Sequence, residues 1–457
     1  HRPIGRWASH IPPFANVGAA CERSRNPRVR TFGAAIVVAV LGAFALGALT
    51  GSRPVPERVS PHGVAVEADW YASLPADPEA ATAAFLDRIP ADARVRGDAF
   101  GATRYITLPL RIAVLVGSIV LILFSGAAAR MRGIARRASS AGVVQDTVFA
   151  VQMFVTMFAL NLPVETFAGF VRFRQAGFSH ATYAQWLMDA TTGWATLTAF
   201  YVVGVVAIMA LIRARPRTWT AWAIAVYVVV SAAYVLALPQ YIEPLFNRIV
   251  PLEDGPAKQA ILSLARANGV PAGDVFVRDA SRQSVLLDAH VSGFGGTARI
   301  VLDDDTIMNT SAAEVRVAMA HEIGHYVLAH VQKSVVFDAL VMGLGILLAA
   351  WIAARLVTRF GPKWGVAGLG DIGALPILWG CFLLWGYLAL PATNGITRQL
   401  EVEADLFGLN ASGQPLALAE FMIRDADTGQ VEPSPFEEWA FYSHPSPRSR
   451  ILAAMRW

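Results

Sequence analysis

Two histidines four residues apart, with a glutamate beside the first, form the clearest chemical motif in the chain. The motif reads His321-Glu-Ile-Gly-His325. Residues four apart share one face of a helix, so both imidazoles can bind one tetrahedral metal ion. Glu322 lies beside them, where it can accept a proton from an attacking water. The residues that precede the motif contain no proline or glycine, and they predict one helix from its cap Ser311 to His330.

A catalytic zinc ion has three protein ligands and an open position, so the motif needs a third ligand from elsewhere. His330 turns off the shared face, and we expect it outside the ligand set or at the surface. Glu401 and Asp405 lie four apart in a second predicted helix. Glu401 can bind the ion, and Asp405 can accept the second N–H of a ligand histidine and fix its orientation. Glu403 points elsewhere, and we expect it in solvent.

The elements that must position these residues are largely apolar. The chain has 457 residues, of which 55% are hydrophobic and 16% are charged, whereas soluble domains carry nearer a quarter charged residues. A helix needs about 20 residues to span a bilayer. The first apolar run exceeds the ~7–15 residues of a signal-peptide core, so we interpret it as a retained span. Seven spans are predicted: Thr31–Gly51, Ile112–Ala129, Thr147–Val164, Ala190–Ile212, Thr218–Ile242, Ala339–Ala354 and Ile372–Thr397.

The order of these spans explains how the two motifs can meet. The sixth and seventh spans follow the first motif directly, and an antiparallel pair returns the chain to the side that it left. The third ligand is therefore expected beside the two histidines. The predicted organisation begins with a polar N-terminal segment (1–30) and five spans with a polar loop at 52–104 (31–244). The first part of a zinc-binding domain (245–333), two spans (334–397) and the second part of that domain (398–457) follow.

Several soluble elements are also predicted. Asp77 is expected to cap a helix in the polar loop, whose sequence suggests no chemistry. The spacing of apolar residues and the turn signals in the protease segments predict the other elements. These are helices at Pro256–Asn268 and Arg398–Leu409, strands at Asp274–Val277 and Arg299–Asp303, and a tight turn at Phe294-Gly-Gly296.

Charge and cysteine content exclude other classes of protein. The net charge of +4 comes mostly from arginines at the edges of spans, which is typical of topology signals rather than of nucleic-acid binding. The expected partner is therefore the lipid bilayer, with no nucleic acid. Cys21 and Cys381 lie far apart, so there is neither a disulfide framework nor a cluster of cysteine ligands.

Taken together, the sequence resembles the type I CAAX prenyl protease family of integral-membrane zinc proteases. The resemblance covers roughly Asp146 to the C-terminus. Besides the two motifs described above, it rests on Leu162-Pro163, Gly177-Phe178, Glu243-Pro-Leu-Phe-Asn-Arg248, Pro251-Leu-Glu-Asp-Gly255, Arg299-Ile-Val-Leu302, Asp305-Thr306 and Tyr442-Ser-His-Pro445 followed by Arg450. It implies an all-α polytopic membrane protein with about seven tilted transmembrane helices around a water-filled chamber. A zinc-metalloprotease domain of helices plus a small β-sheet would cap that chamber.

The resemblance also implies the roles of individual residues. It implies one Zn²⁺ per chain, bound by His321, His325 and Glu401, with Glu322 as the base. His444 and Arg450 match positions that contact the substrate or the developing oxyanion. The family strand that binds an extended substrate carries Asn-Ala-Tyr, and here it reads Asp288-Ala289-His290. Asp288 can accept a backbone N–H but cannot donate as an amide does, so the sequence departs from the family at this point.

The implied function is hydrolysis of peptide bonds, and in particular release of the C-terminal tripeptide of a prenylated protein. The expected partner is a peptide or protein C-terminus, prenylated or not. One alternative is a general membrane quality-control zinc protease. Another is a non-catalytic membrane receptor or scaffold with a structural zinc site. Glu322 argues against the latter, because a structural zinc needs no base.

The expected location is a membrane crossed several times, the inner membrane if the source is bacterial. Arginine-rich loops at 130–137, 213–217 and 355–363 alternate onto one side with the N-terminal arginines. The positive-inside rule makes that side cytoplasmic and places the zinc site opposite. The resemblance instead places the zinc domain on the cytosolic side. We follow the resemblance, because one miscounted span inverts the charge argument.

Overall fold

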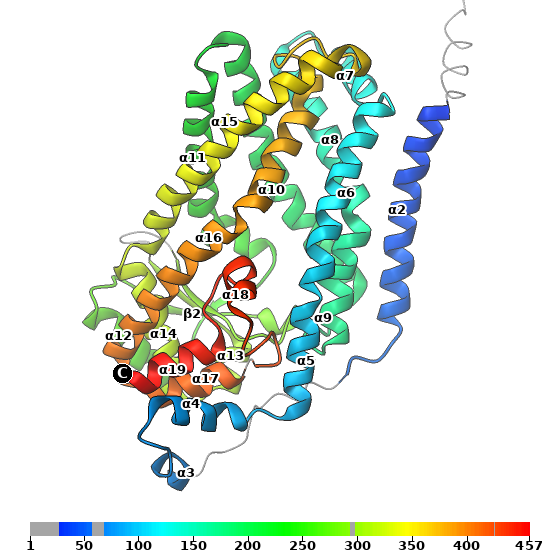
Figure 1. Ribbon diagram of the computed structural model, residues 1–457. Coiled ribbons are helices and arrows are strands. Elements are labelled where there is room, and N and C mark those ends of the chain that lie inside the picture. Colours follow the sequence, from blue (N-terminus) through cyan, green and yellow to red (C-terminus); the bar gives the residue numbers. More distant parts are fainter. Residues whose placement is uncertain (1–26, 57–67, 293–297, 425) are drawn as a thin grey trace, which may run out of the picture.

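Long helices run side by side through most of the molecule (Figure 1). The computed structural model describes residues 27–56, 68–292, 298–424 and 426–457. Within these ranges, seven helices are long and apolar enough to cross a membrane. They contain α2 (Pro27–Gly51), α6 (Arg104–Phe124), α8 (Gly142–Glu165), α10 (Tyr183–Ala214), α11 (Trp219–Ala237), α15 (His330–Trp364) and α16 (Leu375–Ser412). The predicted count of seven is confirmed, and the chain is an integral, multi-pass membrane protein.

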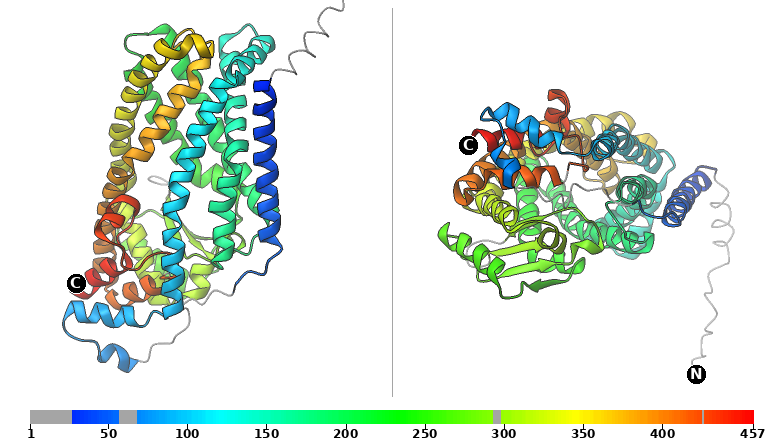
Figure 2. Two further views of the ribbon diagram at one scale, coloured as in Figure 1. Left: turned by 45° about the vertical axis from the view of Figure 1, so that its right-hand side comes forward. Right: turned by 90° about the horizontal axis from the view of Figure 1, so that it is seen from below.

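The membrane helices bury one set of apolar side chains and expose another. Phe149, Met153 and Met209 belong to the largest buried cluster, where α8 packs against its neighbours. Large apolar side chains on the outside, such as Val229 and Leu340, are exposed. A helix that is apolar on all sides is typical of a lipid environment. Helix α2 lies at the edge of the bundle (Figure 2), where it contacts α8.

The segment between the fifth and sixth spans forms a small sheet with helices. The sheet has the order β1-β2-β4-β3, in which β2 and β4 are parallel and the other pairs are antiparallel. Its strands confirm the two that were predicted, and the predicted turn at 294–296 lies outside the described residues. The elements are β1 (Ile249–Pro251), α12 (Pro256–Ala267), β2 (Val275–Arg278), β3 (Ala289–Ser292), β4 (Arg299–Asp303), α13 (Asp304–Asn309) and α14 (Ala312–Val327).

The polar loop after the first span has a structural role that its sequence did not suggest. Its helices are α3 (Ala68–Ala72), α4 (Pro78–Asp87) and α5 (Ala91–Ala102), and the C-terminal helices are α17 (Pro415–Arg424), α18 (Pro435–Phe441) and α19 (Pro447–Arg456). Phe85 and Leu86 share a buried cluster with Ile451 of α19. Glu79 accepts hydrogen bonds from Arg448 and Arg456. Helix α4 therefore supports the C-terminal end of the protease domain.

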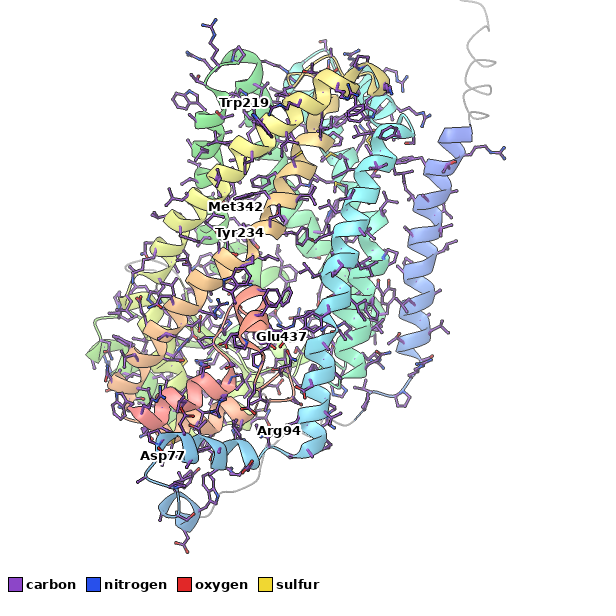
Figure 3. All side chains as sticks on the ribbon, in the orientation of Figure 1. Asp77, Arg94, Trp219, Tyr234, Met342 and Glu437 are labelled. Carbon is purple, nitrogen blue, oxygen red and sulfur yellow. The ribbon has the colours of Figure 1, made fainter. Side chains whose placement is uncertain are left out.

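The two ends of the molecule differ in character. Asp77, which caps α4 as predicted, lies at the protease end, whereas Trp219 at the start of α11 lies at the other end (Figure 3). Helix α7 (Ala127–Ala138), which carries the arginines of one loop, also lies at that other end (Figure 1). A miscounted span therefore does not explain the conflict between charge and resemblance. The cytosolic position of the protease domain stays a prediction, as do the chamber and the domain limits.

Two predicted helices differ from the structure. The helix predicted from Ser311 to His330 is broken, because α14 ends at Val327 and α15 begins at His330. Ala329 separates them with a φ of 57°, in the left-handed region. The cap is confirmed, since the Ser311 hydroxyl accepts the backbone N–H of Glu314. The helix predicted at 398–409 is not separate either, because it continues the seventh span as part of α16.

Candidate metal centre

The three predicted ligands come together at the crossing of α14 and α16. The ligand atoms of His321, His325 and Glu401 all lie within 4.8 Å of one another. Nε2 of His321 lies 3.0 Å from Nε2 of His325. The two carboxylate oxygens of Glu401 lie 3.2 Å and 3.5 Å from these nitrogens. The two histidines come from one helix and the glutamate from another, 76 positions beyond His325 (401 − 325).

Two glycines allow the helices to approach this closely. A Cβ added at Gly408 of α16 would lie 3.1 Å from the backbone nitrogen of His321. A Cβ added at Gly324 of α14 would lie 3.0 Å from the Phe407 ring. Side chains at these positions would push the helices apart, because so close a Cβ contact overlaps its neighbour. The glycines therefore set the distance at which Glu401 reaches the histidines.

The charge of this group fits a bound cation. Burial alone lowers the pKa of His321, but interactions with Asp405 and Glu401 raise it to about 9. Burial and the nearby His321 lower the pKa of His325 to about 4, so this imidazole is neutral, as a ligand must be. Among the described residues, no atom meets hydrogen-bond geometry with the buried Oε2 of Glu401. Two imidazoles and one carboxylate are a typical ligand set for a catalytic zinc.

Asp405 connects the first histidine to Arg450. The Nδ1 atom of His321 lies 2.9 Å from Oδ1 of Asp405. Nε of Arg450 donates to Oδ2 of the same carboxylate at 2.8 Å, and Nη2 donates to Oδ1. Such a two-point contact between a guanidinium and a carboxylate fixes both groups. The structure thus places Asp405 where it was predicted, but places Arg450 on Asp405 rather than on an open substrate position.

Glu322 and His444 both lie close to the candidate ligands. The Glu322 carboxylate lies 3.9 Å from Nε2 of His321, and burial raises its pKa to about 7. A carboxylate with a pKa near neutrality suits general base catalysis. Nε2 of His444 lies 3.4 Å from Glu401, and its side chain is 57% exposed. His444 is therefore open to a ligand from solvent while remaining beside the metal-binding group.

Arg398 holds the loop that carries His444. Its Nη1 atom donates to the carbonyl of Glu438 at 2.7 Å and also to the carbonyl of Tyr442. Arg398 lies on α16, three residues before Glu401, so both side chains share a face of that helix. The sequence analysis missed this residue, and its spacing from Glu401 was the only signal that could have indicated it.

The predicted substrate-binding residues lie at the edge strand of the sheet: Ala289 and His290 belong to β3, and Asp288 directly precedes it. Strand β3 pairs only with β4 within the described residues, and Ala289 pairs with Leu302. Asp288 forms an ion pair with Arg278 at 3.0 Å, and Nε2 of His290 lies 3.1 Å from Glu243. The charges of Asp288 and His290 both affect the pKa of Glu322. The unpaired edge of β3 therefore runs close to the metal-binding group.

His330 and Glu403 also lie at the site. His330 was expected outside the ligand set or at the surface, and Glu403 was expected in solvent. His330 is 2% exposed, and its Nδ1 atom lies 2.9 Å from Nδ1 of His325. Glu403 contacts both Nε2 of His330 and Nζ of Lys333. His330 therefore lies outside the ligand set but against it, which is one of the two positions that were expected, whereas the expectation of a solvated Glu403 was wrong. The break at Ala329 turns His330 back toward α14. Spacing along an unbroken helix could not indicate this.

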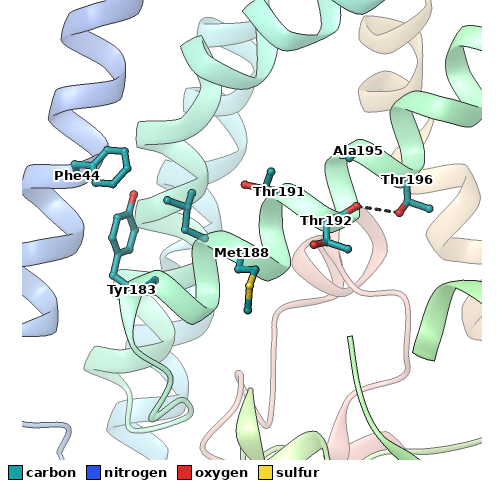
Figure 4. A pocket seen from close by; sticks show the side chains of 9 residues that line it. Phe44, Tyr183, Met188, Thr191, Thr192, Ala195 and Thr196 are labelled. Carbon is teal, nitrogen blue, oxygen red and sulfur yellow. Dashed lines mark hydrogen bonds between the residues drawn. The ribbon is translucent and has the colours of Figure 1, made fainter. Parts of the chain in front are cut away.

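A separate apolar pocket lies between α2 and α10. Phe44 of α2 faces Tyr183 of α10, and Met188 and Thr192 of α10 also line the pocket (Figure 4). No carboxylate or imidazole is among the residues that line it. The pocket therefore lacks the carboxylate and imidazole groups that converge at the crossing of α14 and α16.

Two family models match this chain, one over part of the membrane helices and one over the C-terminal region. A family model described as "CAAX prenyl protease N-terminal, five membrane helices" matches residues 108–248. A second model, "Peptidase family M48", matches residues 251–457, which include all three candidate ligands. A Bacillus subtilis protein named as the uncharacterized metalloprotease YhfN is 28% identical over 309 residues, 67% of this chain and 72% of that protein.

Two further comparisons agree with this result. CAAX prenyl protease 1 of Saccharomyces cerevisiae is 29% identical over 317 residues, which cover 64% of this chain and 68% of that protein. The crystal structure of S. mikatae Ste24p matches with a TM-score of 0.61 at 20% identity. That match covers 94% of this chain and 99% of the other. At this identity, the structural likeness shows the fold.

Proposed function

Because the chain belongs to the CAAX prenyl protease family of membrane metalloproteases, we propose that it hydrolyses peptide bonds at the crossing of α14 and α16 with one bound Zn²⁺. The observation that carries this proposal is the convergence of His321, His325 and Glu401 within 4.8 Å. Peptidases of family M48 are zinc-dependent in general. The ligand types and their burial fit that metal.

Glu322 is the proposed general base. When bound, a zinc ion polarises a carbonyl and makes a water molecule more acidic. The Glu322 carboxylate would accept the proton of the attacking water and then donate it to the leaving amine. Its pKa of about 7 allows both steps near neutral pH. The proton therefore moves through one carboxyl group during the reaction.

His444 is the proposed donor to the oxyanion. Its side chain is 57% exposed with Nε2 beside Glu401, so a scissile carbonyl can approach this imidazole from solvent. A donor that is already oriented stabilises the charge that develops on this oxygen. Arg450 would act less directly, because both of its contacting nitrogens bind Asp405. We propose that it positions Asp405 and, through it, His321.

The substrate would bind as an added strand along β3. An extended peptide can pair with the backbone of an exposed sheet edge, and side-chain pockets then give specificity. Asp288, Ala289 and His290 line this edge, which lies beside α14. The carboxylate of Asp288 already contacts Arg278, so the pairing would rest mainly on backbone groups.

We propose the C-terminus of a protein, with a prenylated cysteine three residues before the end, as the preferred substrate. The yeast relative is named CAAX prenyl protease 1. The candidate ligand Glu401 lies on the same continuous helix as the seventh span. A peptide bound there would lie close enough to the bilayer for a prenyl chain to remain in lipid.

A matched pair of peptides tests this substrate. One peptide carries a farnesylated cysteine three residues before its C-terminus, and the other has the same sequence without the lipid. We expect the purified protein in lipid vesicles to release the intact tripeptide, mainly from the first. Equal cleavage of both peptides and of unfolded casein at internal bonds would instead support a quality-control protease. Mass spectrometry of the products distinguishes the two.

A non-catalytic receptor or scaffold is the remaining alternative from the sequence. The match to family M48 over the whole protease domain makes the chain a metalloprotease. The geometry agrees, since Glu322 approaches His321 without being one of the three converging ligands. A structural zinc site is closed and needs no such residue.

Replacing His444 with alanine is expected to lower kcat by roughly 10²–10³-fold, as loss of one oxyanion donor does. KM should change little, because the interaction strengthens only in the transition state. Zinc should remain bound, since His444 is not one of the three ligands. Turnover within threefold of the wild type, with a lower melting temperature, would make His444 a structural residue of the loop.

A further inference from the structure

The second ligand histidine is held by a chain of side chains that includes a third histidine. Nε2 of His325 faces His321, while its Nδ1 lies 2.9 Å from Nδ1 of His330. Nε2 of His330 then lies 3.3 Å from Oε2 of Glu403. We infer that His330 and Glu403 form a hydrogen-bond relay that orients His325 for metal binding. This inference rests on the proposed zinc site.

The positions of the ring nitrogens determine which nitrogen of each histidine carries a proton. A histidine that binds a metal through Nε2 carries its proton on Nδ1. The Nδ1–H of His325 must then donate to His330, whose own Nδ1 must be an acceptor. His330 therefore carries its proton on Nε2, which faces the carboxylate of Glu403. The order of donors and acceptors is consistent from Glu403 to His325.

This relay is the counterpart of the contact made by the first ligand histidine. His321 binds Asp405 directly through Nδ1 at 2.9 Å. His325 reaches a carboxylate only through His330. Both carboxylates, Asp405 and Glu403, belong to α16, the helix that also supplies Glu401. One helix therefore provides a ligand and both groups that fix the orientation of the other two ligands.

The backbone turn at Ala329 favours the contact between His330 and His325. Ala329 has a φ of 57°, and a residue other than glycine is strained in this region. This turn ends α14 and starts α15 directly at His330. The imidazole is thus brought back against His325, where it is 2% exposed. Strain of this kind is often found at functional sites, where surrounding contacts maintain it.

The outer end of the relay is held by a lysine. Nζ of Lys333 lies 2.9 Å from the same Glu403 oxygen that His330 contacts. Lys333 and Glu403 are partly exposed, with side chains 48% and 36% exposed. An exposed ion pair contributes little to stability. We therefore expect Lys333 to matter much less than Glu403 for the orientation of His325.

A competition titration between the purified protein and a chromogenic zinc chelator tests the relay. His330→Leu and Glu403→Ala are expected to weaken Zn²⁺ affinity by about 10–100-fold, as losses of groups that orient a ligand do. His330→Asn should remain within a fewfold of the wild type, because its amide oxygen replaces the Nδ1 acceptor. Lys333→Met should also remain close to the wild type.

A purely structural role predicts a different result. If His330 only fills space, the melting temperature of the zinc-free protein should fall in His330→Leu, and His330→Asn should be no better. The relay predicts that zinc-free melting temperatures stay near the wild type, while the increase caused by zinc becomes smaller. Unchanged zinc affinity in Glu403→Ala would overturn the relay even if the His330 variants failed to fold.

The same titration separates failure of the relay from failure of the proposed function. Glu401→Ala serves as the reference that removes a ligand. If the wild type and Glu401→Ala bind zinc equally, the proposed metal site is wrong. If Glu401→Ala loses zinc while Glu403→Ala matches the wild type, the site stands and only the relay is wrong.

Discussion

Replacing Glu322 with glutamine is expected to lower kcat by about 10²–10⁴-fold, the usual contribution of a general base, while zinc stays bound. The amide keeps the shape of the side chain but cannot accept the proton of the attacking water. Zinc content should not change, because Glu322 is not among the three converging ligands. Measuring kcat and zinc per chain on the same sample separates the loss of chemistry from the loss of metal.

The matched control is Glu253→Gln, which makes the same chemical change at an exposed position. Its kcat should equal that of the wild type. If Glu322→Gln retained wild-type turnover with zinc bound, Glu322 would not be the base. Activity lost together with the metal would indicate that Glu322 supports the site rather than the proton transfer.

Replacing Glu401 with alanine is expected to abolish both zinc binding and peptidase activity. Its carboxylate supplies the only negative charge among the three converging ligands, and its position is 5% exposed. The remaining two imidazoles would bind zinc weakly. Elemental analysis and a peptide cleavage assay on purified protein measure both effects. Wild-type zinc occupancy in this variant would remove Glu401 from the ligand set.

Val402→Ala is a suitable control for that variant. Val402 adjoins Glu401 on α16, and its side chain is exposed at 48%. We expect this change to leave both zinc content and activity unaltered. A loss of zinc in Val402→Ala as well would point to general disruption of α16 rather than to a missing ligand.

The sequence predicted the ligands because their geometry is local or follows from topology. His321 and His325 are placed by one turn of helix, and a pair of spans returns the chain to bring Glu401 beside them. The strands and caps were also predictable, since their signals lie within a few residues. The histidine spacing, the pair of spans, the strands and the caps can all be read from the order of residue types along the chain.

The contact of His330 with His325, and the part that Glu403 takes in it, could not be predicted from the sequence, and the reason is physical. Alanine is a strong helix former, so nothing in the sequence indicates that Ala329 adopts a positive φ. That single backbone angle changes the direction of His330 and brings it against His325. The buried His330 then contacts Glu403 of α16, which lies 73 positions away in the sequence.

The role of the polar loop also depends on contacts that sequence patterns do not show. Arg88 of the segment between α4 and α5 forms hydrogen bonds with Glu420 of α17, 332 positions later. Glu79 similarly contacts Arg456 near the C-terminus. Ion pairs between such distant segments leave no periodicity in either one. Arg398 supports the loop of His444 from α16 through hydrogen bonds to backbone carbonyls, and its bond to Glu438 likewise joins residues that lie 40 positions apart.

The central claim is that one zinc ion is bound where α14 and α16 cross. The most direct measurement is anomalous X-ray diffraction at the zinc absorption edge from crystals of the purified protein. We expect one strong peak per chain, in contact with Nε2 of His321, Nε2 of His325 and the carboxylate of Glu401. A peak at another position, or no peak there at full zinc saturation, would contradict the proposed active site.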